Sequence, residues 1–248
     1  MTTFCRRFFS LFFLLLVFSH QYGAEEPSVG IPKSLAQQRK NEYVKIKYVL
    51  RARIPEKKSD PIPAVLEISF DILSTKHDLI LDFASSAAVD TITLNGRSVM
   101  WRYVNEHIVI PRENLSLGDS VIRFSFVLGD QSLNRRNDLI YTLFVPDRAR
   151  TAFPCFDQPD MKGTFAVELD LPKGWDAVAN GPAQFAREKM DGRNLIRFLP
   201  SRPLPTYLMA FAAGKLRRLE EVREGRCVQI FHQERDRTAL DRNIPTVF

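Results

Sequence analysis

The sequence predicts an all-β fold in which several antiparallel and mixed sheets pack as a multi-sheet sandwich. Apolar residues alternate with polar ones at a period of two in many segments, the pattern of strands with one buried face. Turn residues separate these segments at intervals of roughly ten residues, which favours stacked antiparallel sheets over βαβ units. The chain has 248 residues, of which 45% are apolar and 26% charged, enough to bury a substantial core.

The clearest strand is predicted in residues 44–54, "VKIKYVLRARI", where every second residue from Val44 to Ile54 is apolar. The same period holds in residues 64–73, 120–128 and 164–171. Asn95-Gly96 lies between two short runs in residues 91–99, and this dipeptide is a strong hairpin signal. The remaining strand candidates are residues 78–83, 107–111, 138–144, 194–200, 206–216 and 227–233.

Residues 1–24 have the features of a signal peptide. The positive start "MTTFCRR" precedes "FFSLFFLLLVF", an uncharged apolar run at residues 8–18 that is short for a bilayer span. Cleavage could follow Ser19 or Ala24, and an uncleaved anchor is the alternative interpretation. The sequence therefore predicts export to the periplasm, the cell surface or the medium, with no transmembrane span after the signal is removed.

The rest of the chain divides into three parts by composition. Residues 25–41 form a polar lead-in, and residues 42–232 form the β-rich domain. Residues 233–248 have mixed charge and possible helical spacing, and we expect them to be a linker or the first helix of a further domain.

Charge and missing motifs exclude several classes of protein. The formal net charge is +6, and removal of Arg6 and Arg7 with the signal leaves +4. The basic residues are scattered, so nucleic acid is not an expected partner. The sequence contains no H-x-x-x-H, no C-x-x-C, no G-x-S-x-G and no glycine-rich phosphate loop. It therefore predicts no catalytic residue and no metal ligand in this chain.

The stretch "FPCFDQPDMKGTF", residues 153–165, combines a cysteine with aromatic, proline and acidic residues. A nucleophilic Cys155 would need a nearby base and a lowered pKa, which its neighbours do not offer. The two prolines favour extended geometry before them, and Asp157 can accept backbone N–H bonds in a turn. We expect a stiff crossover into strand 164–171, with Arg148 or Arg150 paired to Asp157 or Asp160.

Two cysteines remain once Cys5 leaves with the signal. Cys155 and Cys227 could form a disulfide in an exported chain, or both could be buried free thiols. The sequence leaves both alternatives open.

Residues 142–159, "TLFVPDRARTAFPCFDQP", resemble the signature of the aminopeptidase N family of zinc metallopeptidases, which is close to T-Q-F-E-P-T-D-A-R-R-A-F-P-C-F-D-E-P. The two align without a gap. "AVANGP", residues 177–182, is similar to the family's A-x-S-N-x-P, and "TYLMAFAAGKL", residues 206–216, to its S-T-Y-L-x-A-F-x-x-G-x-F. The resemblance covers about residues 42–248.

The resemblance implies the N-terminal domain of such an enzyme, a saddle of antiparallel and mixed sheets. In this family the zinc-binding H-E-x-x-H…E motif lies in the following helical domain, so zinc is expected only in the full-length enzyme. The partners implied are that catalytic domain of the same polypeptide and peptide substrates. This chain alone, lacking H-E-x-x-H, is expected to be inactive.

One departure from the family pattern concerns substrate binding. The Gln and Glu of T-Q-F-E-P, which help to hold the substrate's free α-amine, are replaced by Leu143 and Val145. We expect these two residues to line the substrate cleft, but they cannot anchor an ammonium group.

Two classes of function remain. The first is the non-catalytic N-terminal domain of an exported zinc aminopeptidase, truncated before the zinc site. The second is a stand-alone secreted β-sandwich module that binds peptide, glycan or protein through Trp101, Tyr103 or Trp175. Core packing is the alternative use of those aromatic residues.

Overall fold

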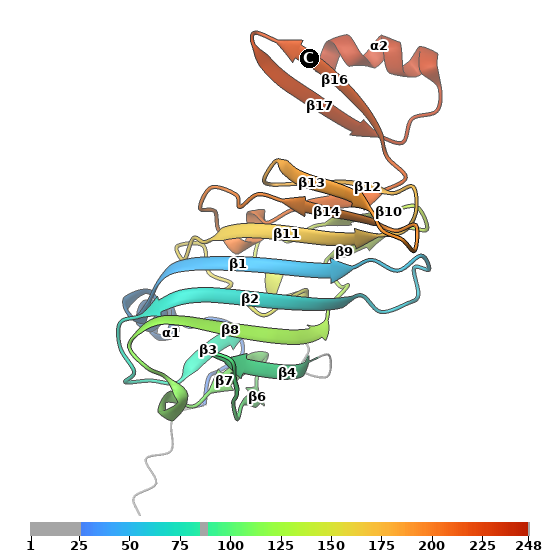
Figure 1. The fold of residues 1–248 in the computed structure, drawn as a ribbon. Coiled ribbons are helices and arrows are strands. Elements are labelled where there is room, and N and C mark those ends of the chain that lie inside the picture. The colour runs from blue at the N-terminus through green and yellow to red at the C-terminus, as the bar shows by residue number, and fades with distance from the viewer. Residues whose placement is uncertain (1–25, 85–88, 248) are drawn as a thin grey trace, which may run out of the picture.

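The computed structural model describes residues 26–84 and 89–247, and the predicted signal peptide lies outside them. An eight-stranded sheet dominates the fold (Figure 1), in the order β13-β14-β11-β1-β2-β8-β4-β5. All neighbouring strands are antiparallel except β1 and β11, which are parallel. Its strands are β1 (Tyr43–Arg53), β2 (Pro63–Ile72), β4 (Val89–Leu94), β5 (Arg97–Ser98), β8 (Gly118–Val127), β11 (Thr164–Leu171), β13 (Ala183–Glu188) and β14 (Asn194–Phe198).

Three smaller sheets complete the β structure, so the prediction of an all-β fold with antiparallel and mixed sheets is confirmed. They are a four-stranded sheet of β12 (Asp176–Ala179), β15 (Phe211–Gly214), β10 (Leu139–Thr142) and β9 (Leu133–Arg135), a three-stranded sheet of β3 (Leu79–Asp82), β7 (His107–Ile110) and β6 (Arg102–Val104), and a ribbon of β16 (Arg217–Arg223) and β17 (Arg226–His232).

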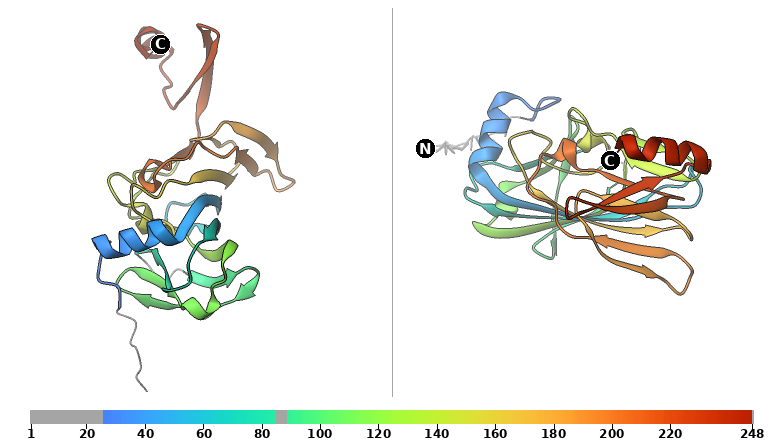
Figure 2. Two further views of the ribbon diagram at one scale, coloured as in Figure 1. Left: turned by 90° about the vertical axis from the view of Figure 1, so that its left-hand side faces the viewer. Right: turned by 90° about the horizontal axis from the view of Figure 1, so that it is seen from above.

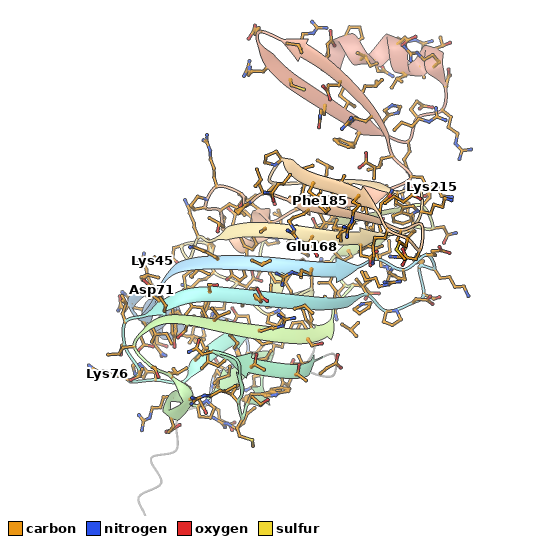
Figure 3. The ribbon with its side chains drawn as sticks, viewed as in Figure 1. Lys45, Asp71, Lys76, Glu168, Phe185 and Lys215 are labelled. Atoms are coloured by element: carbon orange, nitrogen blue, oxygen red, sulfur yellow. The ribbon has the colours of Figure 1, made fainter. Side chains whose placement is uncertain are left out.

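The core lies between the large sheet and the smaller sheets packed on one of its faces (Figure 2). Alternate residues of the central strands point into it, among them Tyr48, Leu66 and Phe124, each 1% exposed or less. The opposite face is polar and charged. Figure 3 shows Lys45, Asp71 and Glu168 on that outer face, where the Lys45 ammonium lies 2.5 Å from the Asp71 carboxylate.

The polar lead-in contains a helix that sequence analysis did not predict. Helix α1 (Lys33–Glu42) has no side-chain cap at its start and buries only Leu35, Arg39 and Glu42. The polar composition of this segment gave no helical signal, because a single large apolar residue cannot make an amphipathic pattern. Its docking depends on a buried arginine rather than on an apolar stripe.

Local geometry changed two of the predicted strands. A bulge in β1 between Val44 and Lys47, with Lys45 at φ 57°, breaks the expected alternation, so that Tyr43 is buried and Val44 only half-buried. Residues 206–216 were predicted as one strand, but they form the 3₁₀ helix η4 (Thr206–Leu208) followed by the short strand β15.

The ribbon β16–β17 and helix α2 (Arg237–Val247) lie apart from the sandwich, at the top of Figure 1. Helical structure in the last segment agrees with its sequence spacing. Within residues 26–84 and 89–247, no helix has the length and the hydropathy that a bilayer span requires.

Candidate functional site

The signature segment, residues 142–159, begins near the surface, enters the core and returns to the surface at Pro159. After Thr142 the chain leaves β10 and runs to the 3₁₀ helix η3 (Ala149–Thr151) through residues that are exposed except for the buried Phe144. From Phe153 to Gln158 every residue is buried. The segment therefore joins a surface to the protein interior within a few residues.

Aromatic packing fixes the buried half of the signature segment. The Phe156 ring stacks on Tyr43 with centroids 5.4 Å apart and meets Phe70 edge-on at 5.9 Å. Phe153 packs edge-on against Tyr48 and Phe144 at 6.4 and 5.7 Å. The Tyr48 hydroxyl accepts a hydrogen bond from the Phe156 backbone N–H at 3.2 Å. Aromatic pairs of this kind add stability beyond their buried area.

Cys155 is a structural residue in this interior. Its backbone pairs with Asp82 through two hydrogen bonds, of 2.8 and 3.0 Å. Burial, followed by the nearby Asp157 and Asp82 carboxylates, raises the pKa of its thiol well above the usual value. A thiol held in its neutral form is a poor nucleophile. Cys155 and the exposed Cys227 are both free, so no disulfide joins them.

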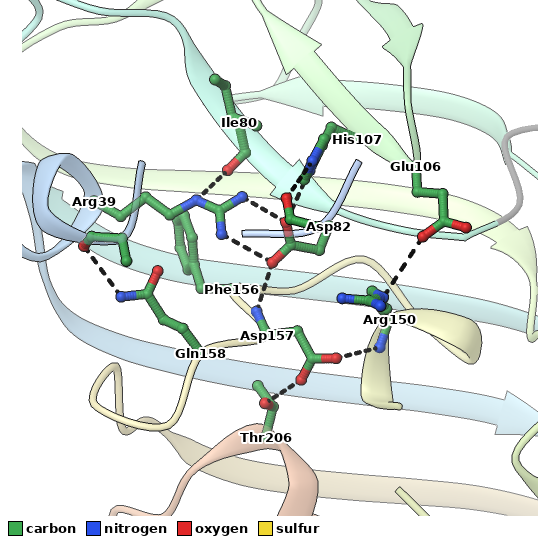
Figure 4. A network of polar contacts seen from close by, with 12 residues as sticks. Arg39, Ile80, Asp82, Glu106, His107, Arg150, Phe156, Asp157, Gln158 and Thr206 are labelled. Carbon is green, nitrogen blue, oxygen red and sulfur yellow. Dashed lines mark hydrogen bonds and ion pairs between the residues drawn. The ribbon is translucent and has the colours of Figure 1, made fainter. Parts of the chain in front are cut away.

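A buried polar network lies beside Cys155 and centres on Asp82 (Figure 4). The Arg39 guanidinium donates two hydrogen bonds to the two Asp82 oxygens, at 2.9 and 2.6 Å. His107 Nδ1 lies 2.9 Å from Oδ1. The Asp157 backbone N–H donates to Oδ2 at 2.8 Å. Arg39 and Asp82 have no exposed side-chain area, so each charge depends on its partner.

These contacts decide the protonation of Asp82. Burial alone would raise the pKa of its carboxyl group, but the charge of Arg39 and the contacts with His107 and Arg39 outweigh burial and lower it below the usual value. Asp82 is therefore an ionised group inside the protein, held by the Arg39 guanidinium and by the Asp157 N–H.

Asp157 extends the network to two more segments. Its Oδ2 accepts a bond from the Arg150 backbone N–H at 3.1 Å, and its Oδ1 accepts one from the Thr206 hydroxyl at 2.6 Å. Burial raises the pKa of Asp157, and these two hydrogen bonds oppose the shift. Asp157 thus accepts one backbone N–H bond, from η3 seven residues earlier, rather than closing a turn of its own as expected.

The predicted ion pairs of the arginines differ from those in the structure. The Arg150 side chain lies 3.7 Å from Glu106 and 3.8 Å from Asp147, while Asp160 pairs with Lys40 at 3.1 Å. The bond from Arg150 to Asp157 uses the backbone because η3 directs its N–H toward the carboxylate.

The three signature-like segments meet in the four-stranded sheet. Strand β15, from the third segment, pairs with β10 on one side and with β12 on the other. The Asn180 side chain donates to Leu208 O at 3.0 Å and accepts from the Ala210 N–H at 2.7 Å. The Asn180 side chain therefore joins the second segment to the third by two hydrogen bonds.

Leu143 and Val145, the predicted cleft residues, lie on the surface just after β10. Their exposed fractions are 55% and 64%. Leu208 on η4, which precedes the strand β15 that pairs with β10, is 47% exposed. A surface cavity of about 580 Å³ is lined elsewhere, by residues 56–59 and Asn137. The positions of Leu143 and Val145 are thus accessible, and their contact with substrate stays a prediction.

The three aromatic residues proposed for the binding-module alternative differ in how far the structure buries them. Trp175 is 5% exposed and belongs to the core, as the packing alternative expected. Trp101 is partly buried and packs against the core, while Tyr103 on β6 is 37% exposed.

Sequence reasoning missed Arg39, Asp82 and His107. The available signal was weak: Asp82 is a charged residue at the end of the apolar run "LIL", and His107 directly precedes "IVI". A charged side chain next to a buried strand requires a partner. The partner of Asp82 is Arg39, which lies 43 residues away in the sequence and therefore leaves no local signal.

Comparison with known proteins gives an independent result. Residues 129–208 match the family model described as the Peptidase M1 N-terminal domain. The chain is 42% identical over 167 residues to "Probable M1 family aminopeptidase 1" of Encephalitozoon cuniculi (strain GB-M1), covering 62% of this chain and 19% of that protein. It is 27% identical over 172 residues to "Aminopeptidase N" of Streptomyces lividans, covering 65% and 19%.

A third relative, "Glutamyl aminopeptidase" of Mus musculus, is 33% identical over 89 residues, covering 36% of this chain and 9% of the relative. The chain thus matches about a fifth of the length of its relatives, or less. The signature segments, the β fold and these matches all support an N-terminal domain of the M1 aminopeptidase family, with residues 129–208 matching its model directly.

Proposed function

We propose that this domain is the non-catalytic N-terminal domain of an exported zinc aminopeptidase that removes N-terminal residues from peptides. The observation that carries the proposal is the meeting of three signature segments in one sheet, beside the exposed Leu143, Val145 and Leu208. In this proposal that surface adjoins a catalytic domain of the same polypeptide and forms one wall of the substrate cleft.

The zinc of the family does not fit the described part of the chain. Within residues 26–84 and 89–247, no three His, Cys, Asp or Glu side chains gather as a metal site, whereas catalytic zinc needs three protein ligands and an open position. The proposal therefore assigns zinc to the catalytic domain and assigns shape and positioning to the β domain.

A direct test measures the chain alone. We expect no tightly bound zinc by mass spectrometry after dialysis and no hydrolysis of amino-acid anilides above a heat-inactivated control. One zinc per chain, or measurable turnover, would contradict the non-catalytic role. The genomic DNA beyond codon 248 gives a second test, because a continuing frame that encodes H-E-x-x-H supports the enzyme, and an unrelated gene supports the stand-alone module.

Export is the second part of the proposal, and its support is the apolar run at residues 8–18. N-terminal sequencing of the protein from its native host should find a start after Ser19 or Ala24. An intact N-terminus on protein recovered from the cytoplasm would contradict export.

The role of Val145 follows from its chemistry. A carboxylate at this position would accept charge-assisted hydrogen bonds from a substrate ammonium, worth roughly 1.5–3 kcal/mol, and valine accepts none. We propose that amine recognition rests on carboxylates of the catalytic domain and that Val145 forms an apolar wall near the first substrate residue.

Val145→Glu in an enzyme that carries both domains tests this role. We expect kcat/KM to change several-fold for free-amine substrates and differently for N-acetylated ones. Leu117→Glu is a suitable control, because Leu117 is 68% exposed and precedes β8, outside the signature segments. Equal changes for both substrate types would show that Val145 does not face the substrate amine.

A further inference from the structure

Residues 26–42, which comprise the described part of the lead-in and the last residue of α1, form a strap across the three-stranded sheet and the signature segment. Pro27 O accepts a hydrogen bond from the Asn105 side chain at 2.9 Å. The carbonyl oxygens of Ser28 and Gly30 each lie 3.0 Å from His107 Nε2. Further along the strap, Ala36 O accepts from the Gln158 side chain at 3.1 Å. The strap therefore contacts β7 and the signature segment at separate points along its length.

Polar bonds, rather than apolar packing, hold the strap in place. Helix α1 has ten residues, and an isolated helix shorter than about 12–15 residues is marginal in water. Leu35 is its one buried apolar side chain. Arg39 supplies the fully buried attachment, with two bonds to Asp82 and a third from Nε to Ile80 O at 3.1 Å. The other ion pairs of α1, Glu42 with His77 and Lys40 with Asp160, each include a side chain that is more than half exposed. Docking of α1 thus depends chiefly on Arg39.

Asp82 links the strap to the signature segment through a shared oxygen. Its Oδ2 accepts both from Arg39 Nη1 and from the Asp157 backbone N–H, while its backbone pairs with Cys155. If Arg39 left, Asp82 would be a buried carboxylate without its main partner. Breaking a buried pair in this way is strongly unfavourable, and movement of Asp82 into solvent would also release the backbone at Cys155 and Asp157.

The contacts of Asp157 connect the buried network to the exposed surface. Its carboxylate holds the Arg150 N–H on one side and Thr206 on the other. Arg150 follows the exposed Leu143 and Val145 in the chain, and Thr206 begins η4, which carries the exposed Leu208. The two flanks of the exposed apolar surface are therefore anchored to one buried carboxylate.

We propose that Arg39 is a positioning residue, which acts through Asp82 and Asp157 to hold the surface formed by Leu143, Val145 and Leu208. The strap supports that surface through the buried contacts of Arg39, Asp82 and Asp157, although none of its residues belongs to the surface itself. The inference concerns this chain alone, and its test does not depend on the proposed peptidase activity.

The two cysteines provide the measurement. Cys155 is fully buried between the Asp82 and Asp157 contacts, while Cys227 is exposed on β17. Alkylation by iodoacetamide under native conditions, followed by mass spectrometry of the two separate peptides, gives one rate for each thiol. In Arg39→Met, we expect the Cys155 rate to rise about tenfold or more through local opening, with the Cys227 rate unchanged. Arg39→Lys should restore part of the protection, because it keeps the charge but loses the bidentate bond.

Arg123→Met is the matched control. Arg123 pairs with Glu67 at 2.7 Å on the outer face of the large sheet and is 54% exposed. Arg123→Met makes the same substitution as Arg39→Met but in an exposed ion pair. We expect it to leave the alkylation rates of both thiols unchanged. An unchanged Cys155 rate in folded Arg39→Met would overturn the proposal, and so would a rise accompanied by equal loss of amide protection in β1 and β2.

Hydrogen exchange in the unaltered chain keeps the proposal testable if Arg39→Met does not fold. The amide hydrogens of Arg150 and Asp157 donate to side chains of the network, so we expect them to exchange together with the amides of α1 and more slowly than those of the exposed Val145 and Asp147. Rapid exchange at Arg150 and Asp157 while α1 stays protected would overturn the proposed link.

Discussion

Two residues that depart from the family signature have different physical settings. Val145 is 64% exposed, so its identity is free of packing constraints within this chain. Gln158 stands where the signature has a glutamate, and it is 3% exposed. Its amide nitrogen donates to Ala36 O at 3.1 Å and to the Asp160 carboxylate at 2.9 Å. Packing therefore does not constrain the residue at position 145, whereas the hydrogen bond to the strap at Ala36 O constrains the residue at position 158.

Gln158→Glu should therefore destabilise the chain, although it restores the family residue. A carboxylate has no N–H to donate, and it would face a carbonyl oxygen and the Asp160 carboxylate. We expect the free energy of unfolding to fall by about 1–3 kcal/mol, measured by urea denaturation at pH 7. Gln184→Glu on the exposed strand β13 is the control, with a change within about 0.5 kcal/mol. Equal stability of both variants would contradict the role of the amide.

At the scale of elements, the strands with alternating residues were predictable and the others were not. β2 and β11 alternate buried and half-buried residues along nearly their whole length, so their period is visible in the sequence. All six residues of β13 are exposed, so its sequence carries no alternation. Helix α1 and η4 escaped prediction because tertiary bonds rather than local periodicity maintain them.

The junction between η4 and β15 illustrates such a tertiary bond. Asn180 exchanges two hydrogen bonds with the backbone of residues 208 and 210. Asn180→Ala should lower the free energy of unfolding by about 1–2 kcal/mol and speed hydrogen exchange at Ala210. Asn180→Asp keeps the acceptor and should lose less stability.

Asn137→Ala is the matched control for this junction, because Asn137 is exposed and its side chain makes no described hydrogen bond. A loss of stability as large as that of Asn180→Ala would show that the effect is not specific to the junction.

At the scale of the whole molecule, long separations in sequence limited the prediction of the site. Arg39 and Asp82 are 43 residues apart, and Asp82 and Asp157 are 75 apart. No local motif encodes such contacts. The family resemblance placed the exposed Leu143 and Val145 in a signature segment, but the buried charges that support this segment became evident only from the folded structure.

The buried carboxylates also predict how stability depends on pH. The folded pKa of Asp82 is lowered, so its contribution is present above the unfolded value of about 3.9 and is lost as pH falls through the folded pKa. The folded pKa of Asp157 is raised, so its protonation favours the fold at low pH and that benefit is lost as pH rises through the folded pKa.

Asp82→Asn should therefore be much less stable than the unaltered chain at pH 7, and the difference should narrow only below about pH 3.9. Thermal unfolding from pH 3 to 8 measures it. Asp130→Asn is the control, because Asp130 is 65% exposed and lies 3.8 Å from Arg135. A difference between Asp82→Asn and the unaltered chain that stays constant across the range would mean that the Asp82 carboxylate has an ordinary pKa in the fold.

The exposed apolar residues near the signature segment predict the behaviour of the isolated chain. Leu143, Val145 and Leu208 are each about half exposed or more, and the edge strand β13 pairs only with β14 among the described strands. Apolar patches and unpaired strand edges promote association. We expect residues 25–248 to aggregate at lower concentration than a protein extended by a catalytic domain, as measured by light scattering.

Leu143→Gln together with Val145→Glu should reduce the aggregation without the added domain, because both changes replace exposed apolar side chains with polar ones. If the short chain is instead monomeric and unfolds reversibly at high temperature, the surface needs no cover and the stand-alone binding module becomes the better interpretation.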